Sequence, residues 1–210
     1  MLRLTEIFYS LQGESTLIGL PTVFIRLTGC PLRCQYCDTE YAFNGGKKRS
    51  IPEILEEVYR YEAQYVTVTG GEPLAQKECI ELMDKLVETH TVSLETSGAM
   101  DISKVNSKVI RIVDIKTPGS KESDKNLLEN LQYLTSQDQL KFVICSQADY
   151  NWSKAFLAEH NLYGRCHILF SPSYHEIQPQ ALAEWILSDR LNVRMQVQLH
   201  KIIWGEKAGV

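Results

Sequence analysis

Three of the chain's six cysteines lie in one short loop with the spacing C-x3-C-x2-C: Cys30, Cys34 and Cys37. The other three stand alone among apolar residues, and we expect them to be buried thiols: Cys79, Cys145 and Cys166. In a reducing compartment, clustered cysteines indicate a metal site or catalysis rather than a disulfide framework. Three closely spaced thiolates suit three irons of a [4Fe–4S] cluster, which leaves one iron open to a small molecule.

Zinc is the main alternative for such a loop. A closed structural zinc site takes four Cys or His ligands, commonly in two pairs. Here no histidine precedes His90 and no second C-x2-C pair exists. The spacing therefore favours the cluster, while a zinc-stabilised binding module without catalysis stays as an alternative. Tyr36, just before the third cysteine, either packs within the loop or stacks on a bound nucleobase.

Composition limits the remaining possibilities. A chain of 210 residues suits one compact domain, which we place at residues 1–210. The net charge of −4 is not the basic footprint of a nucleic-acid-binding protein, and the basic run Lys47–Arg49 is expected to be a solvated loop. The N-terminus lacks an apolar signal segment, and no apolar run approaches the ~20 residues of a membrane helix. We therefore expect a cytoplasmic protein that binds neither nucleic acid nor membrane.

Short β-rich runs alternate with helical patterns along the chain. Strands are predicted at Thr22–Leu27, Tyr65–Thr69, Val92–Glu95, Val109–Ile115, Leu140–Cys145 and Cys166–Phe170. Helices are predicted from the Ser50 capping box onwards, at Glu78–Thr89 and near residues 125–134, 152–160 and 179–188, with an extended run at 196–203. Six strands with interleaved helices favour an α/β fold with a mostly parallel sheet.

Two connections depart from this regular pattern. Only thirteen residues separate Glu95 from Val109, and a parallel crossover needs about a dozen or more, so a helix in the middle is expected to be shortened or missing. The connection from Thr28 to Ser50 is much longer than usual and contains all three clustered cysteines. Because it follows the first strong strand, we expect it at the carboxyl end of the sheet, where α/β barrels place their chemistry.

Polar motifs follow the next strands. The run Thr69-Gly70-Gly71-Glu72-Pro73 combines glycines that permit close backbone approach with a carboxylate that can bind an ammonium group, although a plain Gly-Gly turn is the alternative. Thr96 and Gly98 end the following strand on a shared face. Lys116 ends the strand after that, where it can pair with a carboxylate. Each of these polar ends could otherwise simply be solvated.

Arg26 lies within an otherwise apolar strand, on one face with Thr22 and Phe24. A guanidinium in this position needs an anionic partner. The candidates are Glu14, a substrate carboxylate, or an internal salt bridge that involves no ligand.

The motif C-x3-C-x-aromatic-C after a first strand resembles that of the radical S-adenosylmethionine (SAM) superfamily. This resemblance implies a partial (βα)6 TIM-like barrel of the radical SAM type, with SAM bound at the open iron. It also implies reductive cleavage of SAM to a 5′-deoxyadenosyl radical and an external one-electron donor.

Further motifs resemble one family within the superfamily, the 7-carboxy-7-deazaguanine synthases: LQGE at 11–14, CDT at 37–39, TGGEP at 69–73, ETSG at 95–98 and Gln198-x-His200-Lys201. The resemblance implies a carbon–nitrogen lyase that converts 6-carboxy-5,6,7,8-tetrahydropterin to 7-carboxy-7-deazaguanine with loss of ammonia, a step in queuosine-type biosynthesis. SAM is regenerated, no catalytic side chain is implied beyond the cluster and the SAM radical, and the family is typically homodimeric.

The resemblance also implies a set of site residues. The [4Fe–4S] cluster would be bound by the three clustered cysteines, and Mg²⁺ near the substrate carboxylate by Thr39, because a hard cation prefers oxygen ligands. Substrate contacts are expected from Gln12, Gly13, Glu14, Arg26, Thr96, His200 and Lys201. SAM contacts are expected from Tyr36, Gly70, Gly71, Glu72, Gly98, Asp114, Ile115, Lys116, Ser171, Pro172, Ser173 and Tyr174.

An activase of a glycyl-radical enzyme is a second alternative, because such activases share the cysteine motif. They act on a protein backbone and need a face that binds the partner enzyme. Nothing in the sequence marks such a face, whereas LQGE and CDT indicate a small carboxylated substrate.

Overall fold

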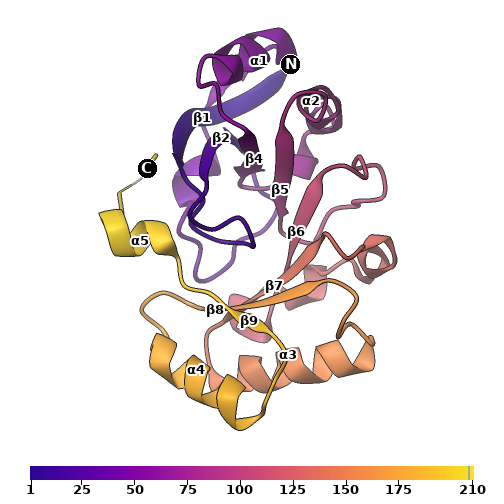
Figure 1. Ribbon diagram of the computed structural model, residues 1–210, viewed down its shortest axis with the longest axis vertical. Coiled ribbons are helices and arrows are strands. Elements are labelled where there is room, and N and C mark those ends of the chain that lie inside the picture. Colours follow the sequence, from indigo (N-terminus) through magenta and orange to yellow (C-terminus); the bar gives the residue numbers. More distant parts are fainter. Residues whose placement is uncertain (208) are drawn as a thin grey trace.

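The computed structural model describes residues 1–207 and 209–210. Its centre is a nine-stranded sheet with the order β3-β1-β2-β4-β5-β6-β7-β8-β9 (Figure 1). The strands are β1 Leu2–Leu11, β2 Pro21–Leu27, β3 Lys47–Arg49, β4 Tyr65–Gly70, β5 Thr91–Thr96, β6 Ile110–Ile115, β7 Gln139–Ile144, β8 His167–Pro172 and β9 Arg194–Met195.

The six predicted strands form the parallel centre of this sheet. β2, β4, β5, β6, β7 and β8 are neighbours in chain order and pair in parallel. β1 joins them antiparallel to β2, β3 pairs with β1, and β9 follows β8. The predicted α/β class is confirmed, with six strands curved as in part of a barrel and the sheet left open.

Most of the helices lie along the outer side of the curved sheet, and the last one lies apart from them near the C-terminus (Figure 1). The helices are α1 Ile51–Tyr59, α2 Cys79–Leu86, α3 Gln147–Glu159, α4 Pro179–Ser188 and α5 Leu199–Trp204. The predicted capping box opens α1: the Ser50 side chain accepts from the Glu53 backbone N–H, and the Glu53 carboxylate accepts from the Ser50 N–H. Apolar side chains between these helices and the sheet form the core.

The middle of the chain has less α-helix than predicted. β5 and β6 are joined without a helix, as expected, and β6 and β7 only by 3₁₀ turns at Pro118–Ser120, Ser123–Lys125 and Leu128–Tyr133. The helix predicted near residues 125–134 is therefore wrong. Asn130 explains part of this, because its side chain bonds the main chain of Gly98, Met100 and Ile102 and so holds the segment against the preceding loop.

Other local predictions also need correction. The run at 196–203, predicted to be extended, contains the short helix α5. The basic segment Lys47–Arg49, predicted to be a solvated loop, forms the edge strand β3, although Lys47 and Lys48 remain exposed. Cys79 is buried as expected, whereas Cys145 and Cys166 are half-buried. In the part of the chain that the structure describes, no helix has the length and apolarity to cross a bilayer.

Candidate active site

A cavity of about 600 Å³ opens on the face of the sheet opposite the apolar core. This face carries Arg26 and Thr69, whereas their neighbours Ile25 and Val68 point into the core. Twenty of the predicted site residues line the cavity: Gln12, Gly13, Glu14, Arg26, Cys30, Cys34, Tyr36, Cys37, Thr39, Gly70, Gly71, Thr96, Asp114, Lys116, Ser171, Pro172, Ser173, Tyr174, His200 and Lys201.

Three predicted SAM contacts do not line the cavity: Glu72, Gly98 and Ile115. Ile115 is 1% exposed and belongs to the apolar core. Gly98 has a φ of +75°, which glycine adopts readily, and its carbonyl accepts from Asn130. The SAM contacts expected of these three positions stay predictions.

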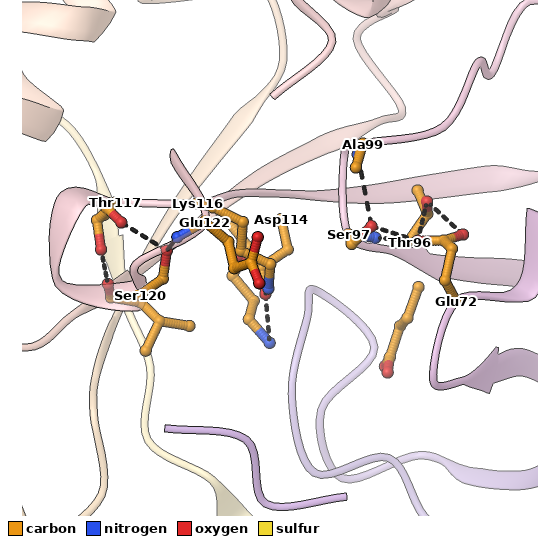
Figure 2. A network of polar contacts seen from close by, with 12 residues as sticks. Glu72, Thr96, Ser97, Ala99, Asp114, Lys116, Thr117, Ser120 and Glu122 are labelled. Carbon is orange, nitrogen blue, oxygen red and sulfur yellow. Dashed lines mark hydrogen bonds and ion pairs between the residues drawn. The ribbon is translucent and has the colours of Figure 1, made fainter. Parts of the chain in front are cut away.

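Glu72 lies outside the cavity lining and is bonded within the protein. Its carboxylate is fully buried and accepts hydrogen bonds from Leu74 N at 2.9 Å, from Thr96 Oγ1 at 2.9 Å and from Ser97 N at 2.7 Å (Figure 2). These donors occupy the oxygens that were expected to bind an ammonium group. Glu72 therefore fixes the carboxyl end of β5 beside the loop after β4.

The cysteine loop packs directly on the glycine motif. Glu72 N donates to Gly29 O at 2.8 Å. A Cβ atom added at Gly71 would lie 2.4 Å from Gly29 O and 2.8 Å from the Cβ of Cys30, so only glycine fits this approach. The close backbone approach predicted for the glycines is confirmed at this position.

The three clustered thiols line one cavity. Cys30, Cys34 and Cys37 are half-buried and all line the cavity. Among residues 1–207 and 209–210, no group of three or more Cys, His, Asp or Glu side chains is arranged to hold a single metal ion, which a structural zinc site requires. Burial raises the pKa of Cys34 to about 11, although the positive charge of Lys116 acts in the opposite direction. Bound iron would therefore have to supply the positive charge that stabilises the thiolates.

Unpartnered polar atoms surround the cavity next to the thiols. Within the described residues, Tyr36 Oη, Asp114 Oδ1, Ser171 Oγ and Ser173 Oγ are buried without a hydrogen-bond partner. Buried polar atoms are normally paired, so these four suit a ligand rich in donors and acceptors, as SAM is.

Lys116 supplies a fixed positive charge at this end of the cavity. Its Nζ lies 3.0 Å from Asp114 Oδ2 (Figure 2). The same atom lies 5.7 Å from the centre of the Tyr36 ring. Burial disfavours the charged form, but the Asp114 carboxylate outweighs this effect and raises the pKa of Lys116 above its usual value. The ammonium is therefore present at neutral pH.

Residues of helix α5 and its N-cap also line the cavity. Gln198 donates to Glu14 Oε1 at 2.8 Å and to Asp38 Oδ2 at 3.0 Å, and Lys201 Nζ lies 3.0 Å from Asp38 Oδ2. Burial opposes the charge on Asp38, yet the ammonium of Lys201 lowers its pKa below the usual range. These contacts tie α5 to the cysteine loop, one residue before Thr39.

The LQGE turn contacts the same helix. Leu199 N donates to Gly13 O at 3.0 Å, and a Cβ atom at Gly13 would lie 2.1 Å from His200 Nδ1. Residues from opposite ends of the chain, predicted from sequence as one substrate-binding set, thus meet in one place.

Arg26 pairs with a residue that the sequence did not single out. Its Nε donates to Glu6 Oε1 at 2.8 Å, across the β1–β2 register, so Glu14 is not its partner. The guanidinium carbon lies 5.8 Å from the ring centres of both Phe8 and Tyr41. Among residues 1–207 and 209–210, only Nε of this guanidinium has a hydrogen-bond partner, so both terminal nitrogens are free of these residues on the cavity wall.

Comparison with known proteins decides the family. The model of the radical SAM superfamily matches residues 24–138. The 7-carboxy-7-deazaguanine synthase of Chlorobaculum tepidum is 44% identical over 211 residues, covering 99% of this chain and 96% of the relative. That of Koribacter versatilis is 42% identical, covering 97% of each. This chain belongs to the 7-carboxy-7-deazaguanine synthase family.

The fold comparison agrees with this membership. The crystal structure of QueE from Escherichia coli superposes with a TM-score of 0.78 at 23% sequence identity, covering 94% of this chain and 93% of that one. Membership in the radical SAM superfamily implies an enzyme with a [4Fe–4S] cluster, SAM and a source of single electrons.

Three residues in or beside the site of this family member were missed from sequence. Lys141 pairs with Glu14 and lies 3.9 Å from Asp114 Oδ2. The sequence did contain a signal for Lys141. A lysine inside the apolar run of β7 needs an anionic partner, as Arg26 in β2 does. Glu95 belongs to the ETSG motif and lines the cavity, but no role was predicted for it from the sequence. Glu6 had no local signal, since its partner depends on strand register.

Proposed function

We propose that the chain is a radical SAM lyase that converts 6-carboxy-5,6,7,8-tetrahydropterin to 7-carboxy-7-deazaguanine with loss of ammonia. The observation that carries this proposal is the single cavity that holds both the three thiols and the terminal nitrogens of Arg26. A guanidinium fork is suited to a carboxylate, and the cavity volume suits a bicyclic substrate beside SAM.

Separate groups of residues would bind the cluster and SAM. The cysteines would hold the [4Fe–4S] cluster, and the unpartnered oxygens of Tyr36, Asp114, Ser171 and Ser173, together with the glycine motif, would face SAM. When bound, the cluster and SAM supply one-electron chemistry through a 5′-deoxyadenosyl radical. The protein's contribution is to position the reacting atoms within about 3–3.5 Å of each other and to exclude water.

The carboxylate end of the substrate would be held from two sides. Arg26 would bind it through its terminal nitrogens. Thr39 would place Mg²⁺ beside it; the threonine hydroxyl now donates to Asp38 Oδ1 at 2.9 Å, so the local donors are oxygens, which suit a hard cation. The rings of Phe8, Phe24 and Tyr41 would form the apolar wall at this end.

The following assignments are proposed because the chain belongs to this family. We assign an external one-electron donor, a homodimeric state, a single functional domain over residues 1–210 and a cytoplasmic location. A cavity of about 600 Å³, lined on one side by residues of α5, is the feature that argues for a small molecule over a protein backbone as the substrate.

An anaerobic assay tests the function. The protein is reconstituted with iron and sulfide, its iron is counted, and reductant, SAM, Mg²⁺ and 6-carboxytetrahydropterin are added. Formation of 7-carboxy-7-deazaguanine without net loss of SAM, followed by mass spectrometry, is the expected result. A protein that binds the cluster and cleaves SAM but does not make this product would refute the proposal, and so would one that binds no iron.

A further inference from the structure

We propose that Tyr41 and Glu6 are positioning residues, which direct the terminal nitrogens of Arg26 toward the substrate carboxylate and link that direction to the cysteine loop. This role rests on the function proposed above, because it requires Arg26 to bind a carboxylate. Neither residue belongs to the motifs that identify the family in the sequence.

One carboxylate oxygen joins three segments of the chain. Glu6 Oε1, on β1, accepts from Arg26 Nε on β2 at 2.8 Å and from Tyr41 Oη at 2.9 Å. Tyr41 belongs to the 3₁₀ turn Glu40–Ala42, which lies shortly after the last cysteine of the motif. An oxygen of a carboxylate has two lone pairs, so these two donors fill Oε1. A shift of the turn would therefore pull on the acceptor that orients Arg26.

The turn that carries Tyr41 is fixed against the start of the cysteine loop. Ala42, the next residue, is fully buried, and its carbonyl accepts from Gly29 N at 2.8 Å. The Ala42 N–H donates to Thr39 O at 2.9 Å. Because Gly29 precedes the first cysteine and Thr39 follows the last, the turn holds both ends of the cysteine motif. The Tyr41 hydroxyl carries this position to Glu6.

The surroundings of Arg26 leave its guanidinium little freedom. The guanidinium carbon lies 5.8 Å from the ring centres of both Phe8 and Tyr41, within the range of cation–π contacts. Phe8 is in turn stacked on Phe24, with the ring centres 4.9 Å apart. The rings limit where the guanidinium can move, and the bond to Glu6 selects its direction.

The occupied nitrogen decides which edge of Arg26 a ligand can use. A guanidinium binds a carboxylate through two parallel N–H bonds, either from Nε and one terminal nitrogen or from both terminal nitrogens. Glu6 occupies Nε, and within the described residues neither terminal nitrogen has a hydrogen-bond partner. The terminal pair is therefore the fork that a carboxylate can meet. Holding this fork in place before the ligand arrives lowers the ordering cost of binding.

The alternative is that the ion pair only stabilises the pairing of β1 with β2, where Glu6 and Arg26 lie opposite each other. Tyr41 separates the two roles, because it lies outside both strands. Removal of a purely structural hydroxyl would change the stability of the protein and leave ligand selectivity as it is. Removal of a positioning hydroxyl changes the affinity for a carboxylate.

Tyr41→Phe is the variant that tests this role, because it removes the hydroxyl and retains the ring and every charge. Dissociation constants are measured by fluorescence titration on the reconstituted holoenzyme, with SAM and Mg²⁺ present, for 6-carboxypterin and for pterin, which lacks the carboxylate. We expect Tyr41→Phe to bind 6-carboxypterin about 2- to 10-fold more weakly, as for the loss of one hydrogen bond, and to bind pterin as the wild type does. Equal effects on the two ligands, or none on either, would overturn the inference.

A double-mutant cycle tests whether Tyr41 acts through Glu6. If it does, the combination of Glu6→Ala with Tyr41→Phe should bind 6-carboxypterin no more weakly than Glu6→Ala alone, whereas additive losses would overturn the linkage. Tyr9→Phe is the matched control, because it makes the same change on β1, where the Tyr9 ring stacks on Tyr61 instead. It should leave both dissociation constants unchanged, and a selective loss like that of Tyr41→Phe would count against the proposal.

If Glu6→Ala failed to fold, the comparison of Tyr41→Phe with the wild type would decide alone. A wild-type protein that does not distinguish 6-carboxypterin from pterin would contradict the proposed function itself, which separates that outcome from a failure confined to Tyr41.

Discussion

Two ion pairs of this protein have the same length and opposite surroundings, so together they measure the effect of burial. Arg111 Nη2 lies 2.6 Å from Asp138 Oδ2, with the two side chains 6% and 0% exposed. Arg60 Nη2 also lies 2.6 Å from Glu56 Oε1, with side chains 72% and 69% exposed. We predict that Asp138→Ala strongly destabilises the fold and that Glu56→Ala has almost no effect.

The magnitude follows from what Asp138 leaves behind. Its carboxylate accepts from Arg111 N and Nε at 3.0 Å each, and from Thr135 N and Oγ1 at 2.8 Å each. Removing it leaves a buried guanidinium unpaired, which costs about 3–5 kcal/mol. For a chain of this size, 1 kcal/mol shifts the Tm by about 2–4 °C, so the Tm should fall by about 6–20 °C.

Thermal melting followed by circular dichroism is the assay. The Glu56→Ala variant should stay within about 2 °C of the wild-type Tm, because exposed i,i+4 pairs contribute little. Equal Tm shifts for the two variants would refute the reasoning, since burial would then not decide the energy of these pairs.

Four predictions concern the active site. Cys34→Ala should abolish cluster binding, seen as loss of iron and of the brown colour; full iron content would contradict its assignment as a ligand. Gly71→Ala should lower the iron content while the far-UV circular dichroism persists, because its Cβ would meet the backbone of the cysteine loop at 2.4 Å. Thr39→Ala should mainly weaken the dependence on Mg²⁺, so an unchanged Mg²⁺ titration would exclude that role. Glu6→Ala should raise KM by about tenfold with little change in kcat, as expected from loss of one charge-assisted bond that orients Arg26; a fall in kcat alone would argue against it.

Local patterns were sufficient to predict the parallel strands and the cysteine loop. The β-branched runs around Val23 and Val66 fit only a buried strand, and three cysteines in a long loop restrict the chemistry more than any composition does. Most of the residues that line the cavity could be predicted, because parallel strands bring their carboxyl ends together and the motifs lie at those ends.

The contacts that were missed depend on tertiary structure. Glu6 meets Arg26 only because β1 pairs antiparallel with β2 in one register. The segment near Asn130 has a helical apolar pattern, yet its amide bonds a distant loop and the chain forms 3₁₀ turns. Glu72 accepts hydrogen bonds from Thr96 and Ser97 at the end of β5, a contact that the sequence of its own loop does not reveal. Polar side chains in such places identify a site, whereas their partners are decided by the fold.

The edges of the open sheet restrict how copies of this chain can associate. A sheet that does not close leaves unpaired N–H and C=O groups on its outermost strands, which are templates for fibrillar assembly. Here the outer strands are β3, with three residues that are all basic, and β9, with two residues. Neither offers a long neutral ladder to an incoming strand. Pairing of folded copies through β3 or β9 is therefore disfavoured, and the sheet edge open to it is that of β1 beyond Leu4, where the register with β3 has ended.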